Sequence, residues 1–205
     1  MFGYLTRAFA LACAGWLVAG CSDPLADPVN PAAPPALAAK PGAPGAASDR
    51  LLYQVRLGPE NGSRSHGVML IEIVGGYLTI TVHAAGLEPG ARIPQHIHEF
   101  ATCEAGGRIL INLDDELTVR GEAPGTGEAY PRSNRAGVMN YYASRSLTDL
   151  LAAVNTYLAA ELPAPLTSVE DLLAWLDLED RNAHMHVASG PPFPAVNCGE
   201  IERLN

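Results

Sequence analysis

The chain has 205 residues and a formal net charge of −9 at pH 7. Such an acidic chain lacks the cationic face that phosphate binding requires, so the balance excludes nucleic acid as a partner. We expect the acidic surface to serve solubility. The length allows one domain with a real core, and the sequence shows neither an internal repeat nor a second domain.

The N-terminus predicts an exported, lipid-anchored protein. Arg7 precedes a short apolar run, residues 8–19, which is too short to span a bilayer and is typical of a secretion signal. Small residues then lead into Cys21, the pattern at which bacterial lipoproteins are cleaved and acylated. We expect residues 1–20 to be a signal peptide and Cys21 to carry the lipid anchor. A plain secretion signal with a chance cysteine is the alternative. Because Ser22 and not an aspartate follows, the periplasmic side of the outer membrane is the expected location.

Residues 21–48 are rich in Pro and Ala and poor in bulky side chains. Such a segment cannot bury a core, so it predicts a disordered tether ahead of a folded domain at residues 49–205. The folded part contains two cysteines, Cys103 and Cys198. In an oxidising, exported setting these two most simply form one disulfide. Closing so long a loop contributes ~3–5 kcal/mol in the chain-entropy model.

Short strands dominate the predicted domain. Apolar runs and alternation predict strands at residues 52–57, 68–74, 77–83, 93–98, 109–113, 138–143, 183–188 and 198–204. Gly75 and Gly76 predict a two-residue hairpin, and residues 120–136 are expected to form a loop. This spacing of strands is typical of an all-β sandwich.

One segment changes to a helical period. Ser146 and Asp149 have the spacing of a capping box, and Pro163 ends the apolar pattern that follows. A second helix is predicted from the cap at Thr167 and Ser168 onward, through residue 176. We therefore expect a two-helix insertion at about residues 146–180, which covers an edge of the sheet.

Two histidine pairs are the main candidates for chemistry. His96 and His98 are two residues apart on one predicted strand, and His184 and His186 repeat that spacing on a later one. Residues two apart on a strand point to the same side, and imidazole is a good ligand for several transition metals. Spacing alone leaves two alternatives open, a metal site or solvated pairs on an exposed face.

Three motifs resemble those of the copper/zinc superoxide dismutase family. The turn Gly-Leu-Glu-Pro-Gly at 86–90, followed by His-Ile-His-Glu-Phe at 96–100 and then Cys103, is similar to the family's central motif. Residues 181–186 resemble the strand that delivers a later copper ligand, and Cys-Gly-Glu-Ile at 198–201 resembles the closing motif. The resemblance covers about residues 67–205 with interruptions. It implies a Greek-key β-sandwich of superoxide dismutase type, to which the two-helix insertion is an addition.

The resemblance also implies site residues. His96 and His98 match the first two copper ligands and His186 matches the late one. Cys103 and Cys198 match the disulfide that ties the active-site loop to the last strand.

His184 has no counterpart in the family. Its side chain is expected to face the same way as that of His186, which makes His184 a candidate fourth ligand. Copper is the expected metal, since imidazole is a good Cu(II) ligand.

Departures from the family pattern concern the rest of the site. No histidine lies between His98 and His184, so the metal-bridging histidine and the zinc-site histidines are missing. Asp114, Asp115 and Glu116 are poor substitutes, and zinc is not expected.

The arginine that attracts superoxide in the family is replaced by Ala195. Steering of this kind raises on-rates by ~10–10³, so the sequence predicts inefficient dismutation even with copper bound.

Two other hypotheses remain. One is a non-catalytic sandwich related to CHRD domains, in which a His-x-His pair is structural and no metal binds. The other is a hydrolase with three histidines and a zinc-bound water, for which the sequence offers no supporting motif. His66 and His83 are expected to be ordinary surface residues, and Glu99 to help fix the loop after the ligand strand.

Overall fold

The computed structural model describes residues 50–105, 107–123, 130–187 and 194–205. The predicted signal peptide, the predicted lipidation site Cys21 and the predicted tether lie outside these ranges, and so do residues 124–129 of the loop expected at 120–136. Within the described ranges, no helix is long and apolar enough to cross a membrane.

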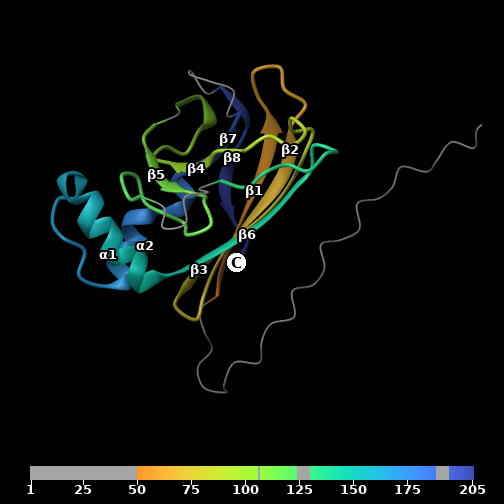
Figure 1. Cartoon of the computed structure of the whole chain (residues 1–205). Coiled ribbons are helices and arrows are strands. Elements are labelled where there is room, and N and C mark those ends of the chain that lie inside the picture. The colour runs from red at the N-terminus through yellow and green to blue at the C-terminus, as the bar shows by residue number, and fades with distance from the viewer. Residues whose placement is uncertain (1–49, 106, 124–129, 188–193) are drawn as a thin grey trace, which may run out of the picture. The chain divides into compact units, whose positions relative to one another are not determined.

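Half of the domain is built from long antiparallel strands (Figure 1). They are β1 (Leu51–Pro59), β2 (His66–Val74), β3 (Tyr77–Ala85), β6 (Met139–Ser146) and β8 (Ala195–Arg203). Gly75 and Gly76 form the predicted two-residue turn between β2 and β3, both with positive φ, which glycine adopts without strain. The predicted alternation on β3 is confirmed, since Leu78, Ile80 and Val82 are buried.

The other half has short strands, β4 (Gln95–His98), β5 (Ile109–Asn112) and β7 (Asn182–His186). The order across the whole sheet is β5-β4-β7-β8-β1-β2-β3-β6. The chain crosses from β3 to β4, returns from β5 to place β6 beside β3, and finally inserts β7 between β4 and β8. Because β8 pairs with both β7 and β1, one continuous sheet curls over a shared core.

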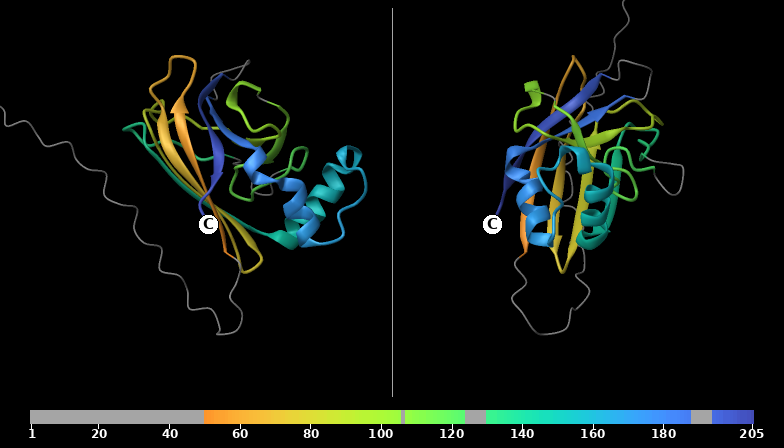
Figure 2. Two further views of the ribbon diagram at one scale, coloured as in Figure 1. Left: turned by 180° about the vertical axis from the view of Figure 1, so that it is seen from behind. Right: turned by 90° about the vertical axis from the view of Figure 1, so that its left-hand side faces the viewer.

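Two helices, α1 (Leu147–Tyr157) and α2 (Val169–Leu176), form the insertion together with single turns η2 (Ala159–Glu161) and η3 (Leu178–Asp180). In Figure 2 both helices lie on the same side of the long strands as β4 and β5. Their apolar faces join the core through Leu150, Val154, Leu172 and Leu176.

The helix caps follow the prediction. Ser146 Oγ accepts a hydrogen bond from the Asp149 amide at 3.0 Å, and a reciprocal capping box links Ser168 with Asp171. The all-β class with a two-helix insertion is therefore confirmed.

Strand bounds differ from the prediction mainly near the histidines. The strand expected from residue 93 begins at Gln95, because Pro94 has no N–H to donate to a ladder. Strand β6 continues to Ser146 and α1 follows without a loop. Strand β8 begins at Ala195, three residues before the expected start, because it pairs there with His186 of β7.

Candidate metal centre

The four candidate histidines come from two neighbouring strands. β4 and β7 are antiparallel, with His96 opposite His184 and His98 opposite Asn182. Because alternate residues of a strand face the same side, His96, His98, His184 and His186 all project from one face of this pair. Their rings are in contact, with centroids 5.2 Å apart for His96 and His186 and 4.7 Å apart for His98 and His184.

Three of these histidines form a compact group. One ring nitrogen from each of His96, His98 and His186 lies within 4.8 Å of those of the other two. Two nitrogens on opposite sides of an ion at ~2.0–2.1 Å are about 4 Å apart, so separations of at most 4.8 Å are close to those that a shared ion requires. His184 is not in this group, and its assignment as a fourth copper ligand stays a prediction. Its ring nitrogen instead lies within 4.8 Å of the sulfurs of Cys103 and Cys198.

One ring nitrogen of His96 makes a hydrogen bond to a side chain, and the other is buried. Its Nε2 lies 3.0 Å from the Tyr130 hydroxyl, whereas its buried Nδ1 has no hydrogen-bond partner among the described residues. Burial, followed by the proximity of His186, His98 and His184, lowers the pKa of His96 to about 3. The imidazole is therefore neutral at pH 7, which is the form that binds metals.

His98 is oriented by backbone. Its Nδ1 lies 3.2 Å from the carbonyl oxygen of Gly107, so the proton belongs on Nδ1 and the lone pair on Nε2. A carbonyl that fixes the tautomer in this way is the usual outer partner of a metal-binding histidine. Burial, and then His98 and His186, lower the pKa of His184 to about 4.

A polar chain behind His96 was not predicted. Tyr130 donates to Asn112 Oδ1 at 3.1 Å, and Asn112 Nδ2 donates to Thr118 Oγ1 at 3.0 Å. Thr118 Oγ1 in turn donates to Asp114 Oδ2 at 2.5 Å. Burial raises the pKa of Tyr130 to about 12, so its hydroxyl keeps its proton. Tyr130 follows a stretch without periodicity, and the sequence carries no signal that would place it against His96.

The carboxylate predicted to be a poor zinc ligand has a structural role. Asp114 is buried, and its Oδ1 accepts hydrogen bonds from the amides of Thr118 at 2.9 Å and Glu116 at 3.2 Å. Neither of the two potential ligand groups found among the described residues contains a carboxylate. Burial raises the pKa of Asp114, against the lowering effect of these hydrogen bonds.

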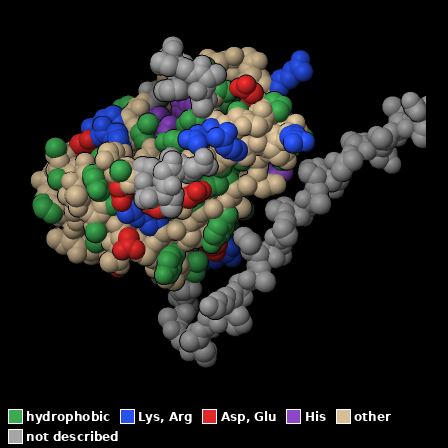
Figure 3. Space-filling model, in the orientation of Figure 1, with side chains coloured by type: hydrophobic (Ala, Val, Ile, Leu, Met, Phe, Trp, Pro, Cys, Tyr) green, Lys and Arg blue, Asp and Glu red, His purple; other side chains and the backbone are tan. Residues whose placement is uncertain are grey.

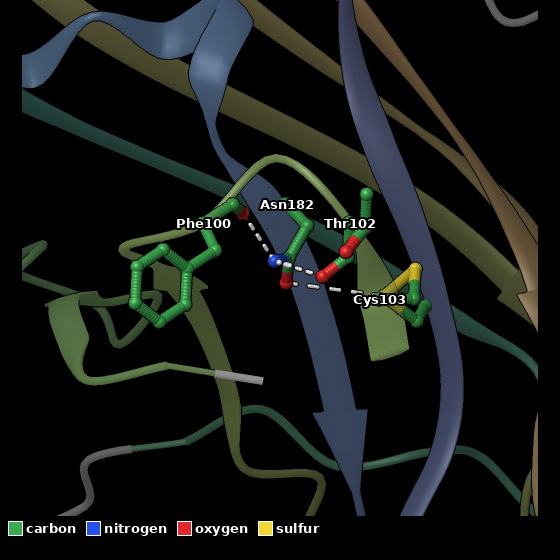
Figure 4. The surroundings of a disulfide bond; sticks show 5 residues. Phe100, Thr102, Cys103 and Asn182 are labelled. Carbon is green, nitrogen blue, oxygen red and sulfur yellow. Dashed lines mark hydrogen bonds between the residues drawn. A yellow bond between two sulfur atoms is a disulfide. The ribbon is translucent and has the colours of Figure 1, made fainter. Parts of the chain in front are cut away.

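The predicted disulfide is present. Cys103 and Cys198 are bonded across 95 residues, with their Cα atoms 5.9 Å apart. Cys103 begins the single turn η1 (Cys103–Ala105), and Cys198 lies in β8. The bond therefore joins the loop after β4 to the last strand, as Figure 4 shows.

The loop after β4 has further anchors on β7. Asn182 Nδ2 donates to the carbonyl oxygens of Phe100 and, at 3.0 Å, Thr102 (Figure 4). Arg181 Nη1 donates to the Glu99 carbonyl at 2.5 Å, and the Glu99 carboxylate pairs with Arg108. The hydrogen bond from Arg108 is the largest cause of the lowered pKa of Glu99. These contacts agree with the expectation that Glu99 fixes this loop.

A pocket gives access to the three-histidine group. Its described lining is Pro94, His96, His98, Ile109, Tyr130 and His186. Figure 3 shows histidine side chains gathered on this face, close to hydrophobic side chains. None of the described lining residues is a lysine or arginine. Ala195, which the sequence resemblance predicts to stand in place of an arginine, begins β8. The histidines expected to be surface residues, His66 and His83, are both exposed.

Comparisons with known proteins give a likeness of fold alone. No family model matches the sequence, and no curated protein matches it significantly. Among solved structures, superoxide dismutase 5 of Candida albicans in its Cu(II) form is similar with a TM-score of 0.46 and 12% identity, over 76% of this chain and 93% of that chain. A mutant of the same protein gives 0.45 and 14% over the same shares. At such values the likeness concerns the general course of the chain, and membership of the superoxide dismutase family stays a prediction.

Proposed function

We propose that this domain binds one copper ion through His96, His98 and His186. The observation that supports the proposal is the convergence of three imidazoles from β4 and β7, each with a ring nitrogen within 4.8 Å of the others. The buried Nδ1 of His96 has no hydrogen-bond partner among the described residues, and leaving a buried acceptor unsatisfied costs ~1–3 kcal/mol. A bound ion removes that cost.

Copper suits this donor set better than other common metals. Three neutral imidazoles without a thiolate or carboxylate favour Cu or Zn over Mg or Ca, and Cu(II) binds such nitrogens most tightly of the divalent first-row ions. Tyr130 on His96 and Gly107 on His98 supply the outer hydrogen bonds that hold ligating rings in place. The arrangement therefore fits copper, which when bound would bring one-electron redox chemistry to the pocket.

We propose that the domain holds copper and dismutes superoxide slowly at most. The described pocket lining offers no cation to attract superoxide, and Ala195 replaces the expected arginine. Without such steering, anion capture loses the ~10–10³-fold advantage that electrostatics provides.

We further propose that Cys21 is acylated and anchors the chain to the periplasmic side of the outer membrane. The support is the sequence pattern of residues 1–22. Incorporation of a labelled fatty acid into the whole protein, and its loss in Cys21→Ala, tests this part separately from copper binding.

The test of copper binding is a calorimetric titration of the mature chain with Cu(II). We expect one ion per chain, and binding at least ~100-fold weaker in His98→Ala, because a ligand matters no less than its outer partners. His83→Ala is the matched control, since His83 is exposed on β3 and outside the group. Equal Cu(II) affinity of His98→Ala and the wild type would reject the proposal, and so would the absence of Cu(II) binding to the wild type. The latter result would favour the CHRD-like sandwich with structural histidines. A superoxide assay on the loaded protein then measures the rate.

A further inference from the structure

His184 lies next to the disulfide and not within the three-histidine group. It is directly opposite Cys198 in the β7–β8 ladder, and one of its ring nitrogens lies within 4.8 Å of both sulfurs. The side chain is 6% exposed, and its Nε2 is buried without a hydrogen-bond partner among the described residues. A buried imidazole nitrogen without a hydrogen-bond partner is uncommon for a merely structural histidine.

The loop that carries Cys103 is held in place by more than the disulfide. Asn182 binds the carbonyls of Phe100 and Thr102, and Arg181 binds that of Glu99. Asn182 is fully buried, which shields its bonds from competing water. Figure 4 shows these bonds beside the disulfide, between the loop and β7. Reduction of the disulfide therefore leaves Cys103 close to Cys198 and His184.

We propose that reduction of this disulfide creates a second metal site, in which Cys103, Cys198 and His184 bind Cu(I). Thiolate sulfur is a soft donor that selects Cu(I), and one imidazole completes a three-coordinate set. The site is distinct from the three-histidine group, although the rings of His184 and His98 are 4.7 Å apart between centroids. The inference does not depend on copper binding by the three histidines.

The chemistry balances with a dithiol as reductant. The dithiol gives two electrons and two protons to the S–S bond, becomes a disulfide itself and leaves two cysteine thiols on this chain. Cu(I) then forms two sulfur–copper bonds and displaces both thiol protons to solvent. No electron is transferred in this second step.

Space for the ion comes from the loop side. One cysteine side chain has to turn so that the ion fits between the two sulfurs. Cys198 is 5% exposed in β8 and has little room, whereas Cys103 is only half-buried and begins the short turn η1. Thiol–disulfide exchange with the oxidised form of the dithiol, which takes up the two electrons from the cysteines and two protons from solvent, would re-form the Cys103–Cys198 bond and release Cu(I). The site would therefore respond to the dithiol–disulfide balance of its compartment.

Anaerobic titration of the mature chain with Cu(I), in competition with a Cu(I)-specific chelator, tests the proposal. The chain is reduced with a dithiol that is then removed, and ascorbate, which leaves disulfides intact, keeps copper monovalent for both the reduced and the oxidised chain. We expect the reduced chain to bind one more Cu(I) than the oxidised chain, with thiolate-to-copper absorption in the near ultraviolet. The same difference is expected in His186→Ala, which dismantles the three-histidine group alone.

Two variants identify the ligands. The additional Cu(I) should be absent in the Cys103→Ser/Cys198→Ser double variant, and its binding should be at least ~10-fold weaker in His184→Ala, with exposed His83→Ala unchanged. Circular dichroism of the reduced, metal-free chain checks that the sheet persists. Equal stoichiometry in both redox states, retention of the additional ion in the double variant, unaltered affinity in His184→Ala, or loss of the sheet on reduction would each overturn the proposal.

Discussion

The long strands and the short strands of the curled sheet bury different kinds of side chain. On β3, apolar residues face the core while Thr79, Thr81 and His83 face outward, so the ladder has one dry side. On β4 all four residues are buried, and His96 and His98 lie on the side away from Ile97. Tyr130, the carbonyl of Gly107 and the disulfide lie against the histidines on that second side. The long half can therefore rely on apolar burial, whereas the short half needs a partner for each buried polar group.

The pairing also differs between the halves. β2 and β3 pair without interruption over nine positions, whereas β4 shifts register against β5 between Ile97 and His98. β7 shifts against β8 between Met185 and His186. Such irregularities re-aim side chains and are over-represented beside functional sites. Changes in the long half should therefore affect stability alone, whereas changes in the short half should also affect metal binding.

The largest expected effect is removal of the disulfide. Because the bond closes a loop over 95 residues, Cys103→Ser/Cys198→Ser should lower the free energy of unfolding by ~3–5 kcal/mol in the chain-entropy model. Urea denaturation of the oxidised wild type and the double variant measures the difference. A change below ~1 kcal/mol would mean that the bonds of Asn182 and Arg181 already restrain the loop.

A truncation in the long half comes next. Ile80 is fully buried on β3. Ile80→Ala should lower the free energy of unfolding by ~2–5 kcal/mol, because apolar burial is lost and a cavity is left behind. His83→Ala on the exposed side of the same strand should change stability by less than ~1 kcal/mol. Copper affinity of the folded Ile80→Ala protein should equal that of the wild type. A matching loss of copper affinity would contradict the separation of the two halves.

In the short half, Asn182→Ala should be costly for its size. The change leaves the Phe100 and Thr102 carbonyls without their donor and loosens the loop that bears Cys103. The free energy of unfolding should fall by ~1–3 kcal/mol as a result. Relative to the wild type, amide hydrogen exchange should accelerate in residues 99–104 and not in β2. Uniform acceleration across both halves would show that Asn182 supports the whole sheet and not this loop.

The sequence predicts the long strands well because their information is local. Leu78, Ile80 and Val82 alternate with polar residues, and the double glycine fixes the turn before them. The histidines are also readable, since their two-residue spacing places each pair on one side of its strand. Which of the four histidines group together depends on the β4–β7 register and on ring orientation, which no local pattern encodes.

The partners of the histidines and of the loop after β4 are the part that sequence could not supply. Tyr130 is 34 residues from His96 along the chain, and Asn182 is 80 from Thr102. Both contacts depend on how loops return over the short strands, and neither loop has periodicity. The same holds for His184, whose proximity to the disulfide follows from its pairing with Cys198 across two strands.

The smallest change that separates a metal site from a structural histidine cluster is Tyr130→Phe. The variant removes one hydroxyl, which bonds His96 Nε2 and Asn112 but no main-chain group in the described structure. Without that bond the His96 ring is free to change tautomer and to place its proton on Nδ1, the buried nitrogen that has no hydrogen-bond partner among the described residues. We therefore expect Cu(II) affinity to fall by at least ~10-fold, the usual effect of losing an outer hydrogen bond to a ligand.

Tyr157→Phe is the matched control, because Tyr157 is exposed on α1. It should leave copper affinity and stability unchanged. If Tyr130→Phe lowers the free energy of unfolding by ~1 kcal/mol and leaves copper affinity intact, the hydroxyl only completes the hydrogen bonds of the buried cluster. A fall in affinity with stability preserved instead shows that the short half is organised around the nitrogen that His96 offers to a metal.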